Sequence, residues 1–224
     1  MSAASTARST IELERAWWRR TFAIFRRPAE VFRALRDEDD RTGARAEPML
    51  LIAWLAGIAA VLASAVGVNP MDGHVTGGGT YDSIDGLTFT VWTFLAGGAY
   101  GFFAYWLLGG AIQLGVRAAG SEAPYRRARH VLVFAAAPIA LSLLAIWPVR
   151  LAIYGSQVFK SGGADTGTGN AIFGGVEAAF GLWSLALLLL GVRIVYRWSW
   201  SRSLGALAFA VLMLALFTAI PFVF

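Results

Sequence analysis

Long hydrophobic runs separated by short polar stretches make up most of this chain. A transmembrane helix needs about 20 mainly apolar residues to cross the hydrocarbon core of a bilayer. Five runs are long enough, and we expect one span from each, at about residues 49–68, 87–116, 131–153, 171–195 and 204–224. The pattern therefore predicts an all-α polytopic membrane protein with five transmembrane helices.

Two of these runs contain features that interrupt helices. The 87–116 run includes Gly97-Gly98 and Gly109-Gly110, but dividing it at either pair leaves halves too short to cross a bilayer. We therefore expect one long helix there, which can tilt or project from the membrane. Pro138 and Pro148 can kink the 131–153 run.

The segment before the first span has a different, amphipathic pattern. Ser9 and Glu12 have the spacing of a capping box, and Pro28 should break or restart the helix. Aromatic and aliphatic residues share one face and arginines the other, as in a helix lying at the membrane interface. Packing of this helix under the ends of the spans is an alternative, and both can hold. We expect residues 1–46 to form this segment and 47–224 the transmembrane domain.

Composition excludes a soluble globular protein. Hydrophobic residues make up 57% of the chain and charged residues 15%, against about 25% charged in a typical soluble chain. The net charge of +5 would suggest nucleic-acid binding in a soluble protein, but here the cations follow the membrane topology, and we expect no nucleic-acid partner. Lys160 is the only lysine among 19 cations, a bias that, with the many alanines, suggests a high-GC prokaryote.

The positions of the cations predict the orientation. Seventeen of the 19 lie on one side of a five-span chain, and Arg150 and Lys160 lie on the other. Because cytoplasmic loops are enriched in Lys and Arg, we expect a multi-pass protein of the cell membrane with its N-terminus in the cytoplasm and its C-terminus outside. Anionic headgroups and a protein partner are the expected contacts of this face. The candidate contact residues are Arg15, Arg19, Arg20, Arg26, Arg27, Arg126, Arg127 and Arg129.

Two charged residues, Glu177 and Arg150, fall inside predicted spans at similar depth. Charge within a bilayer is costly, so such residues are candidates for function. Glu177 could couple transport to protons or ions, or the two side chains could form a structural pair, with Arg150 alternatively extending toward the headgroups.

Small residues four apart occur at Gly97 and Gly101 and again at Gly174 and Ala178. This spacing lets two helices approach closely, either within one chain or in a homo-oligomer.

Groups that could perform chemistry are few. The chain has no cysteine, and its two histidines, His74 and His130, are expected on opposite sides of the membrane. No catalytic triad, metal-ligand cluster or phosphate-binding loop is present in the sequence. We therefore predict no catalytic residue, no cofactor, no metal and no enzymatic activity.

Three motifs together resemble the Yip (Ypt-interacting-protein) domain family of five-span membrane proteins, as a prokaryotic-type member. These are the entry segment from Phe25 to Leu35, the start of the third span from Tyr125 to Pro138, and the run from Trp183 to Ala206. The resemblance covers about residues 22–224. It implies association with Rab-type GTPases and vesicle traffic in eukaryotic members, with no catalytic residues to carry over.

These observations favour a non-catalytic membrane protein that organises the bilayer or a partner complex. The alternative is a transporter of small solutes or ions, a channel or a lipid scramblase that uses Glu177. A third hypothesis is an accessory subunit whose partner supplies the chemistry.

Overall fold

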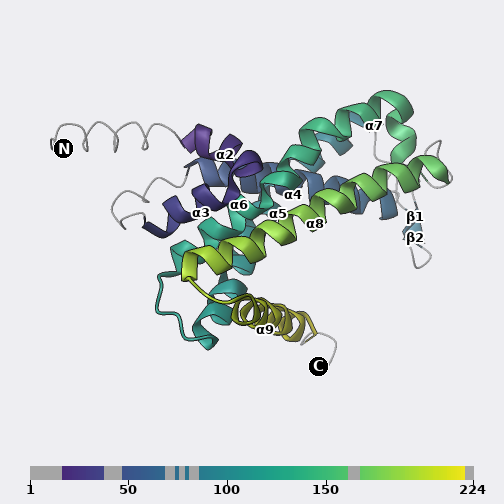
Figure 1. Ribbon diagram of the computed structural model, residues 1–224. Coiled ribbons are helices and arrows are strands. Elements are labelled where there is room, and N and C mark those ends of the chain that lie inside the picture. The colour runs from purple at the N-terminus through teal and green to yellow at the C-terminus, as the bar shows by residue number, and fades with distance from the viewer. Residues whose placement is uncertain are drawn as a thin grey trace. The chain divides into compact units, whose positions relative to one another are not determined.

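The computed structural model describes residues 17–37, 47–68, 74–75, 79–80, 86–160 and 167–219 (Figure 1). Almost all of this part of the chain is helical. The helices are α2 (Trp17–Arg26), α3 (Pro28–Asp37), α4 (Glu47–Val68), α5 (Gly86–Ala118), α6 (Tyr125–Ala145), α7 (Trp147–Tyr154), α8 (Thr168–Tyr196) and α9 (Trp200–Ala219), with a 3-10 turn, η2, at Gly155–Phe159.

Five helical segments of the described chain are long and apolar enough to cross a membrane, which confirms the predicted fold class. They are Met49–Val66, Thr88–Ala118, Tyr125–Phe159, Thr168–Tyr196 and Trp200–Phe217. The last begins at Trp200 rather than near Leu204, because Ser199 caps it: the Ser199 hydroxyl accepts a hydrogen bond from the Arg202 amide at 3.3 Å.

Proline divides two of the helical segments. Pro28 opens α3 directly after Arg27, as expected for a residue that lacks an N–H group. Pro148 stands at the start of α7 and separates it from α6, whereas Pro138 lies inside α6 without ending it. The third span is therefore built from α6, α7 and η2 rather than from one helix.

Part of the loop between α4 and α5 forms a small β-ladder. Strand β1 (His74–Val75) pairs antiparallel with β2 (Gly79–Thr80), with His74 opposite Thr80. The Ser9–Glu12 capping box lies outside the described residues.

The chain separates into two compact units. Unit 1 comprises Met1–Leu51, Leu107–Ala135 and Ala186–Phe224, and unit 2 comprises Ile52–Trp106 and Ala136–Leu185. Helices α4, α5, α6 and α8 each contribute residues to both units.

Unit 1 is held together by α3. Phe32 is fully buried, and a Cβ atom on Gly191 of α8 would meet both its ring and the Val131 side chain of α6. Other buried residues of unit 1 include Ile24, Val31, Leu35, Val116 and Val192. Of the apolar face predicted for the N-terminal segment, Ile24, Phe32 and Leu35 are buried, whereas Phe22 is 70% exposed.

Unit 2 has an aromatic core. The rings of Trp147 and Phe159 lie parallel, with their centroids 6.2 Å apart, and Phe89 packs on Phe159 at 4.5 Å. Ile58 and Leu62 of α4 complete the cluster, which joins α4, α5, α7 and η2.

Glycines bring α4 and α5 into backbone contact within unit 2. A Cβ atom on Gly101 would overlap the carbonyl oxygen of Ala53, and one on Gly97 would overlap the backbone of Ile58. Gly57 faces both glycines from α4. In contrast, a Cβ atom on Gly174 of α8 would have no atom within 4 Å, and Ala178 is exposed. One of the two glycine pairs predicted from sequence therefore lies in a helix contact within the chain.

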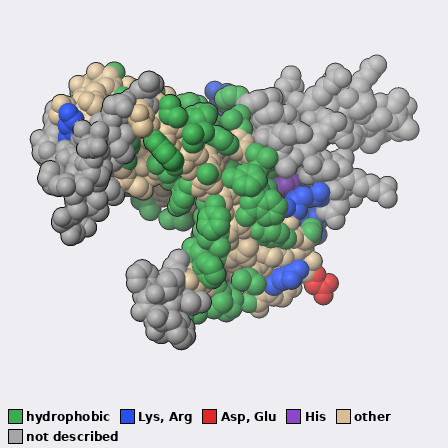
Figure 2. Space-filling model, turned by 180° about the vertical axis from the view of Figure 1, so that it is seen from behind, with side chains coloured by type: hydrophobic (Ala, Val, Ile, Leu, Met, Phe, Trp, Pro, Cys, Tyr) green, Lys and Arg blue, Asp and Glu red, His purple; other side chains and the backbone are tan. Residues whose placement is uncertain are grey.

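Large hydrophobic side chains are exposed along the spans, as lipid contact requires (Figure 2). Helix α9 is the clearest case: Val211 and Phe217 are at least 60% exposed, while Ala206 and Ala210 are buried. The narrow buried edge of α9 packs on Gly115, where a Cβ atom would overlap the carbonyl oxygen of Ala206.

The glycine contacts predict a contrast between two identical substitutions. Gly101→Ala should destabilise the protein by about 1–3 kcal/mol, because the added methyl group must displace the α4 backbone. Gly174→Ala should leave stability unchanged or raise it, since the site is open and alanine is the better helix former. Thermal unfolding of the purified proteins in detergent measures both. Equal midpoints would contradict the close α4–α5 contact.

Candidate functional site

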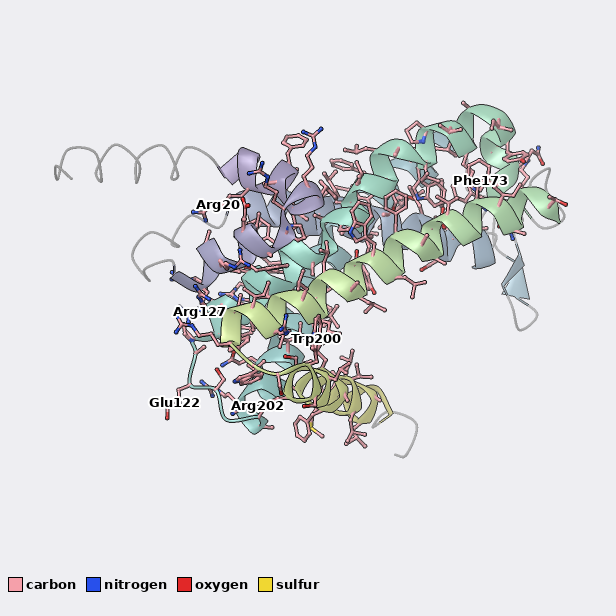
Figure 3. The ribbon with its side chains drawn as sticks, viewed as in Figure 1. Arg20, Glu122, Arg127, Phe173, Trp200 and Arg202 are labelled. Atoms are coloured by element: carbon pink, nitrogen blue, oxygen red, sulfur yellow. The ribbon has the colours of Figure 1, made fainter. Side chains whose placement is uncertain are left out.

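Arginines concentrate in unit 1. Apart from Arg150 and Lys160, every lysine and arginine of the described chain belongs to this unit. Figure 3 labels three of them, Arg20 on α2, Arg127 on α6 and Arg202 on α9. The acids of unit 1 whose side chains are described, Glu30 and Glu122, are both exposed. This unit therefore carries a strong excess of positive charge.

Helix α2 presents an arginine and an aromatic ring on its exposed surface. Phe22 is 70% exposed, and Arg26 and Arg27 are also exposed. Arg27 contacts Glu30 at 3.6 Å, with both side chains largely in solvent, so the ion pair contributes little to stability. Of the other candidates, Arg15 lies outside the described residues, and Arg19 belongs to α2 with its side chain not described.

The first turns of α6 carry three further candidates, Arg126, Arg127 and Arg129. The Arg129 guanidinium stacks over the Tyr125 ring at 4.6 Å, and its aliphatic stem lies against Gly109 of α5. His130 follows them and is buried. These three arginines are partly buried rather than fully exposed.

The turn from α8 to α9 places cations and aromatic rings in alternation. Arg193 lies over the Trp200 ring at 4.4 Å, and Arg202 lies over the Trp198 ring at 4.6 Å. Trp198 in turn stacks on Tyr196, with the ring centroids 5.1 Å apart. Sequence reasoning counted Arg193, Arg197 and Arg202 only toward topology, although their alternation with aromatic residues is visible in the sequence.

Arg202 also fastens α9 to the end of α5. Its Nε donates a hydrogen bond of 3.0 Å to the Ala119 carbonyl oxygen, and its Nη2 donates to the same atom. Such side-chain donors satisfy a carbonyl that would otherwise remain unpaired at a helix C-terminus. Nearby, Gln113 donates to the Ala123 carbonyl oxygen at 2.9 Å and so holds the α5–α6 loop.

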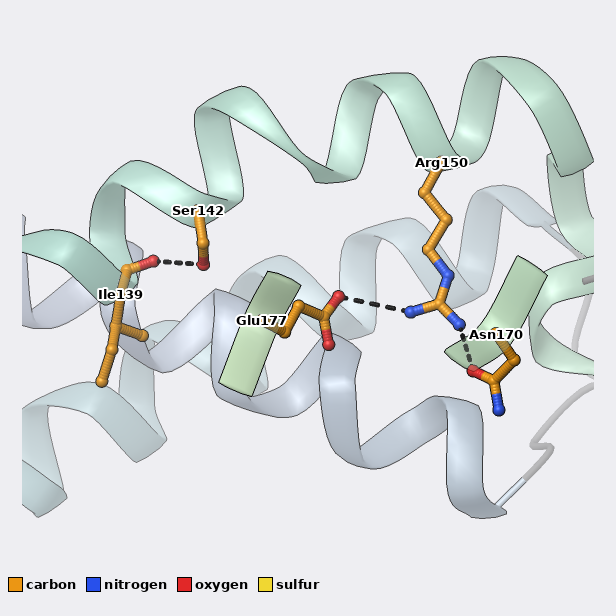
Figure 4. A network of polar contacts seen from close by, with 5 residues as sticks. All are labelled: Ile139, Ser142, Arg150, Asn170 and Glu177. Atoms are coloured by element: carbon orange, nitrogen blue, oxygen red, sulfur yellow. Dashed lines mark hydrogen bonds and ion pairs between the residues drawn. The ribbon is translucent and has the colours of Figure 1, made fainter. Parts of the chain in front are cut away.

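In unit 2 the structure brings together the two charged residues that the sequence placed inside spans (Figure 4). Arg150 Nη1 lies 3.2 Å from Glu177 Oε1, and the exposed fractions of the two side chains are 1% and 18%. The Arg150 guanidinium also lies 5.4 Å from the Trp147 ring and 5.5 Å from the Phe173 ring. The arginine thus clamps α7 to α8.

Asn170 is a third member of this network that sequence reasoning missed. Its Oδ1 accepts a hydrogen bond of 2.8 Å from Arg150 Nη2. It lies in the first turn of α8, one residue before the predicted start of the fourth span at about residue 171. The available signal was its position seven residues before Glu177, which places both on one face of a helix.

Among the described residues, no group of three or more His, Asp or Glu side chains is arranged to hold a metal ion. The polar network of unit 2 and the arginines of unit 1 can supply hydrogen bonds and positive charge for binding and positioning.

Comparison with known proteins gives one match. The model of the Yip1 domain matches residues 22–220, nearly the whole chain. No curated protein and no solved structure matches the chain significantly. The matched region includes α3, all five spans and both polar sites.

The clamp in unit 2 predicts strong coupling between its charges. Arg150→Met and Glu177→Gln should each destabilise the protein by about 3 kcal/mol, because each leaves a buried or half-buried charge without its partner. The double variant should lose less than the two single losses combined, by at least about 0.5 kcal/mol. Equilibrium unfolding of the detergent-solubilised protein measures this coupling. The control Lys160→Met should cost no more than about 0.5 kcal/mol, and additive losses would show that the pair is not coupled.

Proposed function

The chain belongs to the Yip1 domain family of membrane proteins, and from this premise we propose that it is a non-catalytic scaffold of the cell membrane. The arginine-bearing ends of the helices of unit 1 face the cytoplasm and contact anionic lipid headgroups and a protein partner. In this arrangement the N-terminus is cytoplasmic and the C-terminus lies outside.

The distribution of charge is the observation that carries this proposal. The described cations other than Arg150 and Lys160 fall in unit 1, and the acids there whose side chains are described, Glu30 and Glu122, are exposed. Positive residues are retained on the cytoplasmic side of a membrane, where the anionic leaflet attracts them. An arginine-rich surface facing that leaflet gains about 1 kcal/mol for each cation near it.

The exposed surface of α2 supports lipid contact by a second route. Phe22 projects from the same short helix as Arg26, and Arg27 follows that helix directly; an aromatic ring beside cations is typical of helices in the headgroup region. The opposite face of α2 and α3 is buried in unit 1. The two helices would therefore lie between the spans on one side and the lipid headgroups on the other. The same exposed face is available to a protein partner.

A homo-oligomer remains an alternative form of the scaffold. Gly174 and Ala178 lie on an exposed face of α8, where a helix of a second copy could approach as closely as α4 approaches α5.

The proposal predicts a preference for anionic lipid in the full-length protein. In native mass spectrometry from detergent, phosphatidylglycerol should bind at least about tenfold more tightly than phosphatidylcholine, because several arginines contribute. The preference should weaken as salt rises from 50 to 500 mM, since counterions screen exposed charges. Equal binding of the two lipids at low salt would refute a headgroup-binding role.

The scaffold proposal and the transporter alternative predict different ion and lipid flux. Under the scaffold proposal, purified protein in liposomes should show no ion leak or lipid scrambling above protein-free vesicles, because Arg150 holds the Glu177 carboxylate in a structural pair. Glu177→Gln should therefore change stability and leave flux at background. A flux that is present in the wild type and vanishes in well-folded Glu177→Gln would replace the scaffold by a transporter.

A further inference from the structure

We infer that the α8–α9 turn of unit 1 is a discrete binding site for the phosphate of an anionic phospholipid, held by Arg193 and Arg197 beside the Trp200 ring. The inference rests on the proposed function, in which the arginine-rich unit meets anionic headgroups. It adds the place where one headgroup is held and names residues that lie outside the candidates predicted from sequence.

The length of the turn determines its depth in the membrane. Helix α8 ends at Tyr196 and α9 begins at Trp200, and both are long and apolar enough to span. The linking residues 197–199 can extend over at most about 10 Å. A connection this short between two spans must stay at the level of the headgroups, so its cations meet lipid phosphates.

Arg193 is held in a geometry that suits a phosphate. Its guanidinium stacks over Trp200 at 4.4 Å, and its Nε is buried without a hydrogen-bond partner. Stacking covers a face of the guanidinium and the Nε is buried, so a phosphate would be bound by the terminal Nη groups, whose paired N–H donors suit its oxygens. Trp200, labelled at the start of α9 in Figure 3, is 48% exposed, so the stack is not enclosed by the protein.

Arg197 occupies a backbone position that normally favours glycine or asparagine. Its φ is +57°, and the Trp198 amide donates to the Arg193 carbonyl oxygen at 3.0 Å, as at the left-handed end of a helix. An arginine there strains the backbone relative to glycine. Local folding therefore does not explain why arginine stands at this position, whereas an exposed cation at headgroup depth does.

The neighbouring residues orient the turn and keep its charge uncompensated. Arg202 stacks on Trp198 and is fastened to the Ala119 carbonyl oxygen, so it positions the turn. The acids of unit 1 whose side chains are described, Glu30 and Glu122, both lie outside α8, α9 and the turn between them. The part of α8 and α9 that belongs to unit 1, residues 186–219 of the described chain, carries no acidic residue, so an added anion would meet two cations without a competing carboxylate from this stretch.

The site predicts that stability and lipid binding change in opposite directions. Arg197→Gly should hold or raise the unfolding temperature, because glycine relieves the positive φ. It should nevertheless weaken phosphatidylglycerol binding by about fivefold, the share of one arginine. Arg193→Gln combined with Arg197→Gly should weaken it by more than roughly tenfold. Native mass spectrometry of the full-length chain in detergent, titrated with phosphatidylglycerol, measures both losses.

The matched control removes two exposed arginines of unit 1 from other elements, Arg33 on α3 and Arg117 on α5. Arg33→Gln with Arg117→Gln should change phosphatidylglycerol binding by less than about twofold. Equal losses in the two double variants would overturn the discrete site and leave a diffuse arginine surface. Unchanged binding in Arg197→Gly and in its double variant would also overturn it. A wild type without any preference for phosphatidylglycerol over phosphatidylcholine would instead refute the proposed function itself.

Discussion

Hydrocarbon offers no hydrogen-bond partner to a peptide group, and this constraint determines where each part of the chain can lie. Segments within the bilayer must be helices, which satisfy their own backbone. The break at Ile146 in the third span obeys the same constraint, because the Ile146 amide donates to the Ser142 carbonyl oxygen and the Ile146 carbonyl oxygen accepts from the Arg150 amide. The three-residue turn after Tyr196 shows the result, because it changes chain direction while Arg202 satisfies a carbonyl at the end of α5. Charge and aromatic rings accumulate at this turn, which in the proposed arrangement is where the chain meets water and phosphate.

Inside the bilayer, apolar residues gain little by leaving lipid for protein, so contacts depend on shape and on polar groups. Unit 2 uses both means. Gly57 and Gly101 let the backbones of α4 and α5 touch, and Arg150 draws α7 and α8 together through Glu177 and Asn170. Helix α9 of unit 1 also makes a close contact through small residues, in which Ala206 packs on Gly115 of α5. Most of its surface remains available to lipid.

The spans could be predicted because hydropathy is a property of neighbouring residues and needs no knowledge of partners. Packing could be predicted only in part. Gly101 and Gly174 have the same sequence spacing, yet one touches α4 and the other touches nothing, because a missing side chain permits contact without specifying it. Arg150 and Glu177 could be predicted as a pair because both fall inside spans at similar depth. Asn170 could not, because it lies just before the hydrophobic run of the fourth span. Arg193 and Arg197 enter the sequence prediction only as two of the seventeen cations on one side of the membrane. Their individual contacts could not be predicted, because these depend on a tight turn that hydropathy does not encode.

The clamp between Arg150 and Glu177 has a consequence for the order of membrane insertion. During synthesis the segment containing Arg150 emerges 27 residues before its partner carboxylate, and an unpaired arginine within a span costs about 2.5–3.5 kcal/mol at the insertion machinery. The third span, which contains α7, therefore inserts less favourably while it is alone, and its place in the membrane becomes stable once α8 is present. These two helices would leave the translocon as a pair, so that biogenesis, and not only the finished fold, depends on a single carboxylate.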